Sequence, residues 1–100
     1  MPHLDMATAH TLGKEEALRR LKEKFSAVRN TYGTRVSDLE EEWNGSTLSF
    51  RFKAMGMKVS GTVMVEDSEV RLDANLPFAA VMFKGMIEKQ IRAELGSLLA

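Results

Sequence analysis

The sequence predicts an α+β fold in which an antiparallel sheet of about four to five strands carries two helices packed on one face. Two amphipathic segments, residues 14–31 and 77–99, enclose a middle region in which apolar and polar residues alternate. That alternation has a period of two, which is typical of strands with one buried and one solvated face. The connections within the middle region are short, so neighbouring strands must run antiparallel. At 100 residues, we expect a single domain over residues 1–100.

Composition limits the classes of function. The chain has 44% hydrophobic residues, no cysteine, and 14 basic against 14 acidic residues. The lack of cysteine excludes disulfides, thiolate metal sites and a cysteine nucleophile, and the zero net charge gives no general basic field for nucleic acid. No apolar run reaches the roughly 20 residues that span a bilayer, and residues 1–6 lack the pattern of a secretory signal. We therefore expect a cytoplasmic protein without a membrane span.

The first two elements are expected to be an edge strand and a helix. Residues 3–10 alternate loosely, which predicts a short strand at an edge of the sheet. Thr11 is the expected N-cap of the helix, and Glu15 and Glu16 lie in its first turn, where the helix dipole favours acids. Gly33 suits the left-handed conformation that ends a helix. The apolar stripe of this helix comprises Ala17, Leu18, Leu21, Phe25 and Val28.

The middle region is expected to supply the remaining strands. Residues 34–42 carry an acidic run without clean alternation, so we expect a loop that leads into a short strand ending at Trp43. The pair Asn44-Gly45 then predicts a two-residue hairpin turn. Three clearly alternating segments follow, at residues 48–53, 57–65 and 70–76.

The second helix is expected to begin at Pro77, because proline is tolerated at the first helical position, and to run to about Leu99. Gly85 inside it is expected to mark a close contact. The predicted buried stripe comprises Ala80, Phe83, Ile87, Ile91, Leu95 and Leu98. Three further residues widen the apolar surface beyond what one sheet face needs, namely Ala79, Met82 and Met86.

No motif for catalysis or cofactor binding is complete. Residues 56–63 hold two glycines at the separation of a phosphate-binding loop, but Thr62 stands where the lysine is required. His3, Asp5 and His10 would offer three ligands to a metal, or else be ordinary strand and turn residues, since nothing fixes a shared geometry. No serine has the flanking glycines of a nucleophile elbow. The sequence therefore predicts no cofactor, no metal site and no enzyme activity.

A local basic face is one candidate binding surface. Arg51, Lys53 and Lys58 cluster on the polar face of the central hairpin, where they would meet RNA or another anionic surface. Aromatic residues that stack on bases are missing there, since Phe50 and Phe52 point to the other face. The other interpretation is a solvated face that keeps the domain soluble. A nucleic-acid-binding regulator is thus the alternative function.

Methionines supply the other candidate surface. The chain has seven, and methionine is a flexible, polarisable residue that suits irregular apolar partners. Met57 and Met86 fit ordinary core packing, whereas Met55, Met64 and Met82 fit either the core or an exposed apolar patch. Met86 is also one of the residues that widen the apolar surface of the second helix beyond what one sheet face needs. The residues predicted to bind a partner are Met55, Met64, Ala79, Met82 and Met86.

Several segments share their order of residues with one known family over nearly the whole chain. They are residues 1–5, 10–12, 15–17, 43–50, 61–65, 70–72, 76–77, 83–88 and 91–92. With these segments the chain resembles the small polyhydroxyalkanoic acid (PHA) system proteins. The resemblance implies a bacterial protein encoded with genes of polyhydroxyalkanoate synthesis or utilisation, some of whose relatives lie at the storage-granule surface. It carries no catalytic motif, and residues 34–42 depart from it by a longer acidic stretch.

We therefore expect a non-enzymatic accessory protein that binds the PHA granule surface, or a granule-bound protein, through an apolar patch. A weak homodimer is also expected, because Met82, Met86 and Leu99 lie on the flank of the second helix and residues 3–8 offer an unpaired strand edge. Burial of a few hundred Å², at roughly 25 cal/mol per Å², gains about as much as association costs. The dimer should therefore depend on concentration.

Overall fold

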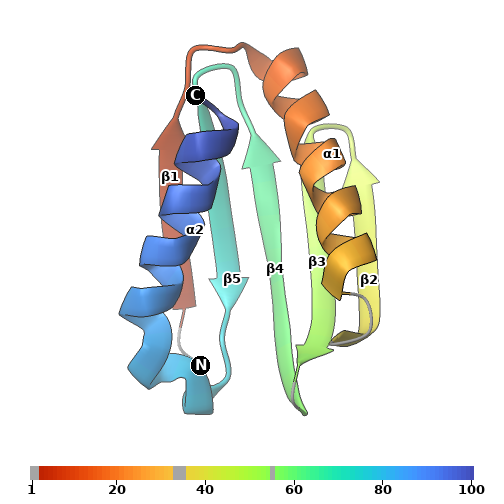
Figure 1. Ribbon diagram of the computed structural model, residues 1–100, viewed down its shortest axis with the longest axis vertical. Coiled ribbons are helices and arrows are strands. Elements are labelled where there is room, and N and C mark those ends of the chain that lie inside the picture. Colours follow the sequence, from red (N-terminus) through yellow and green to blue (C-terminus); the bar gives the residue numbers. More distant parts are fainter. Residues whose placement is uncertain (1–2, 33–35, 55) are drawn as a thin grey trace.

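The computed structural model describes residues 3–32, 36–54 and 56–100, which form a five-stranded antiparallel sheet with two helices on one face (Figure 1). The elements in chain order are β1 (His3–Ala9), α1 (Lys14–Tyr32), β2 (Val36–Asn44), β3 (Thr47–Ala54), β4 (Met57–Val65), β5 (Glu69–Asn75), the 3-10 helix η1 (Phe78–Phe83) and α2 (Lys84–Leu98). The strand order is β1-β5-β4-β3-β2, so β1 and β2 are the edges. The predicted fold class is confirmed.

Each helix covers one half of the same sheet face. Figure 1 shows α2 over β1 and β5, and α1 over the half that contains β3 and β2, with the two helices running in opposite directions. The strands alternate, so every second side chain points toward the helices. The core between the helices and the sheet comprises Leu4, Met6, Ala17, Leu21, Leu48, Val63, Val65, Val70, Leu72, Ala74, Leu76 and Leu99.

The segment between β1 and α1 is held by His10. The His10 Nε2 donates to the Glu66 carbonyl oxygen at 2.9 Å, and the Leu12 backbone N–H donates to Nδ1 at 3.2 Å, which together require the neutral tautomer with hydrogen on Nε2. The predicted N-cap at Thr11 is wrong. Helix α1 begins later, at Lys14, and the Gly13 carbonyl accepts a hydrogen bond from the Ala17 N–H at 3.1 Å. Gly13 has a φ of 82°, a left-handed conformation that glycine adopts without strain.

Strand β2 is longer than the short strand predicted. Its register against β3 shifts between Ser37 and Glu40. These two residues are three positions apart in β2, whereas the residues that pair with them, Lys53 and Arg51, are two positions apart in β3. One extra residue of this kind is a bulge, and it interrupts the alternation that identifies a strand in the sequence. The acidic run therefore lies in the strand instead of a loop. Glu41 faces the helix layer opposite Phe50, where Arg29 of α1 forms an ion pair with its carboxylate.

The segment after β5 begins as a 3-10 helix, whereas the sequence predicted a continuous α-helix. Pro77 is its N-cap, and α2 begins at Lys84. A 3-10 helix turns about 20° more per residue than an α-helix, so the apolar stripe moves around the axis within η1. Phe83, predicted to be buried, is consequently exposed. The stripe residues that do pack on the core are Ala80, Ile87, Ile91, Leu95 and Leu98.

Two smaller predictions for this helix are also wrong. Gly85 marks no close contact, because a Cβ at that position would meet no heavy atom within 4 Å. Leu99, expected on the flank of the helix, is buried, since the last turn of α2 brings it onto the core.

Candidate functional site

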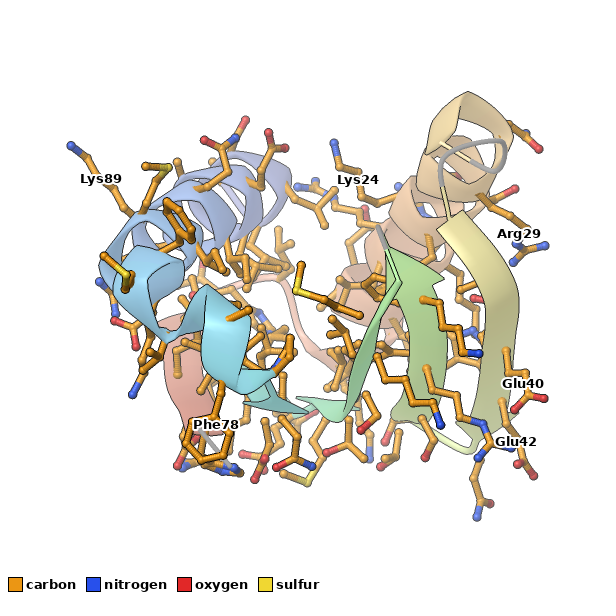
Figure 2. The ribbon with its side chains drawn as sticks, turned by 90° about the horizontal axis from the view of Figure 1, so that it is seen from below. Lys24, Arg29, Glu40, Glu42, Phe78 and Lys89 are labelled. Carbon is orange, nitrogen blue, oxygen red and sulfur yellow. The ribbon has the colours of Figure 1, made fainter. Side chains whose placement is uncertain are left out.

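An exposed apolar surface covers η1 and the beginning of α2. Met82 is 87% exposed and Phe78 is 74% exposed, and the other large apolar residues of the segment are exposed as well. Figure 2 shows Phe78 at a corner of the molecule, below the sheet edge. We call this surface the η1 patch, and it comprises Phe78, Val81, Met82, Phe83 and Met86.

The residues predicted to bind a partner do not form one surface. Met82 and Met86 lie in the η1 patch, and Ala79 is an exposed neighbour of theirs on η1. Met64 is half-buried on the sheet face that points away from the helices, because it alternates with Val63 and Val65, which are core residues. Met55 lies outside the described residues. Met86 is exposed, so its assignment to ordinary core packing is wrong.

Three members of the η1 patch, Phe78, Val81 and Phe83, are not among the residues that the sequence pattern identifies. The pattern places Phe83 in the buried stripe because α-helical periodicity is assumed from Pro77 onward. A signal does exist, since residues 76–83 are apolar without interruption. A helix buries only one side of its surface, so some residues of an uninterrupted apolar run must stay exposed to water.

An apolar groove separates the two helices. Arg20 of α1 donates to the carbonyl oxygens of Leu98 at 3.0 Å and Ala100 at 2.9 Å, and an ion pair of 3.1 Å joins Lys24 to Glu94 farther along. Beyond these contacts the helices diverge toward the end that carries η1 (Figures 1 and 2). The space between them has a volume of about 370 Å³. We call it the interhelix groove.

Among the described residues, only hydrocarbon side chains line the interhelix groove. They come from both helices and from four strands, and they comprise Leu4, Leu21, Phe25, Phe50, Phe52, Val59, Val63, Leu72, Ala74, Leu76, Ile87, Ile91 and Leu95. Phe25 also contacts Trp43 edge-on, with 6.5 Å between the ring centroids. Lys22 lies 5.2 Å from the Trp43 ring centroid. The only tryptophan of the chain therefore adjoins the wall of the groove.

The opposite face of the sheet carries charges of both signs. The alternation of the strands places four cations there, Arg51, Lys53, Lys58 and Arg71. It also places five carboxylates there, Asp5, Glu40, Glu42, Glu69 and Asp73. Glu40 forms an ion pair with Arg51, and Figure 2 shows Glu40 and Glu42 at the outer edge of this face. The predicted basic cluster is thus interleaved with acids.

The histidines do not converge on a common site. His3 lies on the exposed edge strand, where its Nε2 is 2.9 Å from Asp73, while His10 is buried and bonded to backbone groups. Within residues 3–32, 36–54 and 56–100, no three histidine or acidic side chains are grouped so as to hold a metal ion.

Comparisons with known proteins give one family match. Residues 4–99 match the family model described as "Putative polyhydroxyalkanoic acid system protein". No curated protein matches the chain. Among solved structures, the chain is similar to the crystal structure of TTHA0849 from Thermus thermophilus, with 18% identity, a TM-score of 0.42, and coverage of 98% of this chain and 92% of that chain. In the part of the chain that the structure describes, no helix is long and apolar enough to cross a membrane.

Proposed function

Since the chain belongs to the family of polyhydroxyalkanoic acid system proteins, we propose that it is a non-enzymatic accessory protein that docks on the polyester surface of the PHA granule. The family match confirms the resemblance found in the sequence and gives a role related to PHA. The docking surface is the η1 patch, and its exposure is the observation that carries the proposal.

The chemistry of the η1 patch suits an extended apolar surface. Its five side chains are all apolar, and the two most exposed, Met82 and Phe78, are large. Several large apolar side chains exposed on one short segment are typical of a surface that serves an interaction. Methionine adapts its shape to an irregular apolar partner, which suits a polymer surface without a fixed structure.

The surroundings of the chemically reactive residues support a non-enzymatic role. The buried His10 is occupied by backbone bonds, and Glu41 is ion-paired with Arg29. The alternative, a regulator that binds nucleic acid through Arg51, Lys53 and Lys58, is weakened by the carboxylates that share their face.

The test is the binding of the full chain to artificial polyhydroxybutyrate particles that carry no other protein. We expect Met82→Glu and Phe78→Glu each to lower affinity at least tenfold, because burial of one such side chain contributes about 1.5–3 kcal/mol. Both side chains are exposed, so the variants should keep the fold and the melting temperature. Lys58→Glu on the opposite sheet face is the matched control and should bind like the wild type.

Three outcomes would overturn the proposal. The first is failure of the wild type to sediment with the particles. The second is binding only to native granules that retain their proteins, which would identify a granule-bound protein as the partner. The third is binding that Lys58→Glu and rising salt abolish while Met82→Glu leaves it intact, which would favour the basic face.

A further inference from the structure

We propose that the interhelix groove is a binding site for a single linear hydrocarbon chain, such as the alkyl chain of a fatty acid or a fatty alcohol. This site is separate from the η1 patch, and the proposal does not depend on granule docking. It rests on the lining, the dimensions and the closure of the groove.

The lining restricts the chemistry of the occupant. All thirteen side chains that border the groove in the described part of the chain are hydrocarbon, so a polar group beside them would lose its hydrogen bonds to water without replacement. An extended peptide would bring unpaired backbone N–H and C=O groups into this surface. The part of the ligand that enters must therefore contain only carbon and hydrogen.

The dimensions restrict its shape. The groove runs along α2 from Ile87 to Leu95, and eight residues of α-helix measure about 12 Å. The space of about 370 Å³ between the helices and the sheet extends over that length. One hydrocarbon chain fits, with its atoms at van der Waals distance from both helices and the sheet.

Among the described residues, the contacts between the helices close one end of the groove and leave the other open. Arg20 ties α1 to the last carbonyl groups of the chain, and the Lys24–Glu94 ion pair bridges the helices near that end. The helices are farthest apart toward η1 (Figure 1). The hydrocarbon tail therefore enters from the η1 end, and the polar head stays in water at the opening.

The groove also differs from an ordinary protein interior, which is close-packed with few voids larger than a water molecule. Phe25, Phe52, Val59, Ile87 and Ile91 line it yet remain only partly buried. A bound alkyl chain would remove these side chains from water and supply the dispersion contacts that they lack.

The test uses the fluorescence of Trp43, which contacts the groove residue Phe25. We expect dodecanoate and dodecanol, each below its aggregation concentration, to change the emission saturably with one molecule per chain. Because the head group stays in water, the acid and the alcohol should bind with affinities within about threefold of each other. Butyrate, whose tail is too short to fill the groove, should bind at least a hundredfold more weakly.

Variants separate this site from the η1 patch. Val59→Phe fills the groove and should weaken dodecanoate binding at least tenfold, whereas Met64→Phe, on the other face of the same strand, should leave it unchanged. If Val59→Phe does not fold, Ile87→Gln provides a second test, since its half-buried side chain lies at the open end. Met82→Glu should weaken granule docking at least tenfold without changing dodecanoate binding.

The proposal is overturned if the wild type shows no saturable binding, or if Val59→Phe binds dodecanoate as tightly as the wild type does. It is also overturned if the wild type is a dimer that Val59→Phe converts to a monomer and that dodecanoate leaves intact, because a second copy of the chain would then occupy the groove.

Discussion

Gly61 shows how one residue allows the central strands to pack. It lies in β4 between Phe50 of β3 and Ala74 of β5. A Cβ at this position would lie 2.4 Å from the Asp73 carbonyl oxygen and 2.9 Å from the Ala74 Cα, and both of these atoms belong to the backbone. Backbone cannot move aside as a flexible side chain can, so the close approach of β5 requires glycine here.

We expect Gly61→Ala to lower the free energy of unfolding by about 1–3 kcal/mol, because the added methyl group overpacks the sheet. Chemical denaturation would measure the change. Gly96→Ala in α2 is the control, since its Cβ would meet no heavy atom within 4 Å. That variant should gain roughly 0.5–1 kcal/mol from the higher helix propensity of alanine. Equal stability of Gly61→Ala and the wild type would contradict the steric explanation.

At the scale of elements, a charged network on α1 connects the two helices. Glu16 accepts hydrogen bonds from Arg19 at 2.9 and 2.6 Å and from Arg20 at 2.8 Å. The bonds from Arg19, followed by those from Arg20, lower the pKa of Glu16 from 4.5 to about 2. Because Arg20 also donates to the carbonyl oxygens of Leu98 and Ala100, Glu16 helps to orient the side chain that holds the end of α2.

This network predicts a dependence of stability on pH. The pKa of Glu16 is lower in the folded state, so its contribution is fully present above pH 4.5 and is lost as the pH falls toward about 2. We expect Glu16→Gln to have a flatter profile of melting temperature between those two pH values than the wild type. Glu15→Gln, at the exposed neighbouring acid, should keep the wild-type profile. An unchanged profile for Glu16→Gln would show that the network does not stabilise the fold.

At the scale of the whole molecule, the η1 patch and the β1 edge are the surfaces that correspond to the two dimer contacts expected from the sequence. Asp5 projects from β1 toward the polar face, and a charged side chain on an edge strand discourages pairing with another edge strand. The burial of Leu99 also removes one residue from the flank first expected to pair. Contact through Met82 and its neighbours is therefore the route that we propose for self-association.

We expect a weak homodimer whose population rises with protein concentration, because the gain from burying so few side chains roughly equals the cost of association. Sedimentation velocity over a range of concentrations would measure it. Met82→Glu should shift the population to monomer. Polyester particles should do the same, since they compete for the same patch. A pure monomer at high protein concentration would exclude the dimer.

The local pattern of the sequence determined the fold class and most of the elements. Strict alternation over residues 57–65 and 70–76, with short connections, permits only antiparallel neighbours with one apolar face. The two helical segments had to cover that face, because no other element could bury it. The local pattern also identified Ala79, Met82 and Met86, which lie on or beside the η1 patch, but not Phe78 or Phe83.

The tertiary structure alone decided the rest. Pairing with β3 extends β2 through an acidic run that has little strand character of its own. The 3-10 turn after Pro77 exposes Phe83, and no residue of that segment specifies such a turn by itself. The interhelix groove depends on the positions of α1 and α2 relative to each other. Contacts such as the hydrogen bond from Arg20 to the carbonyl oxygen of Leu98, 78 residues apart, set these positions. Local periodicity shows which face of an element is buried, but the space left between two elements depends on both of them at once.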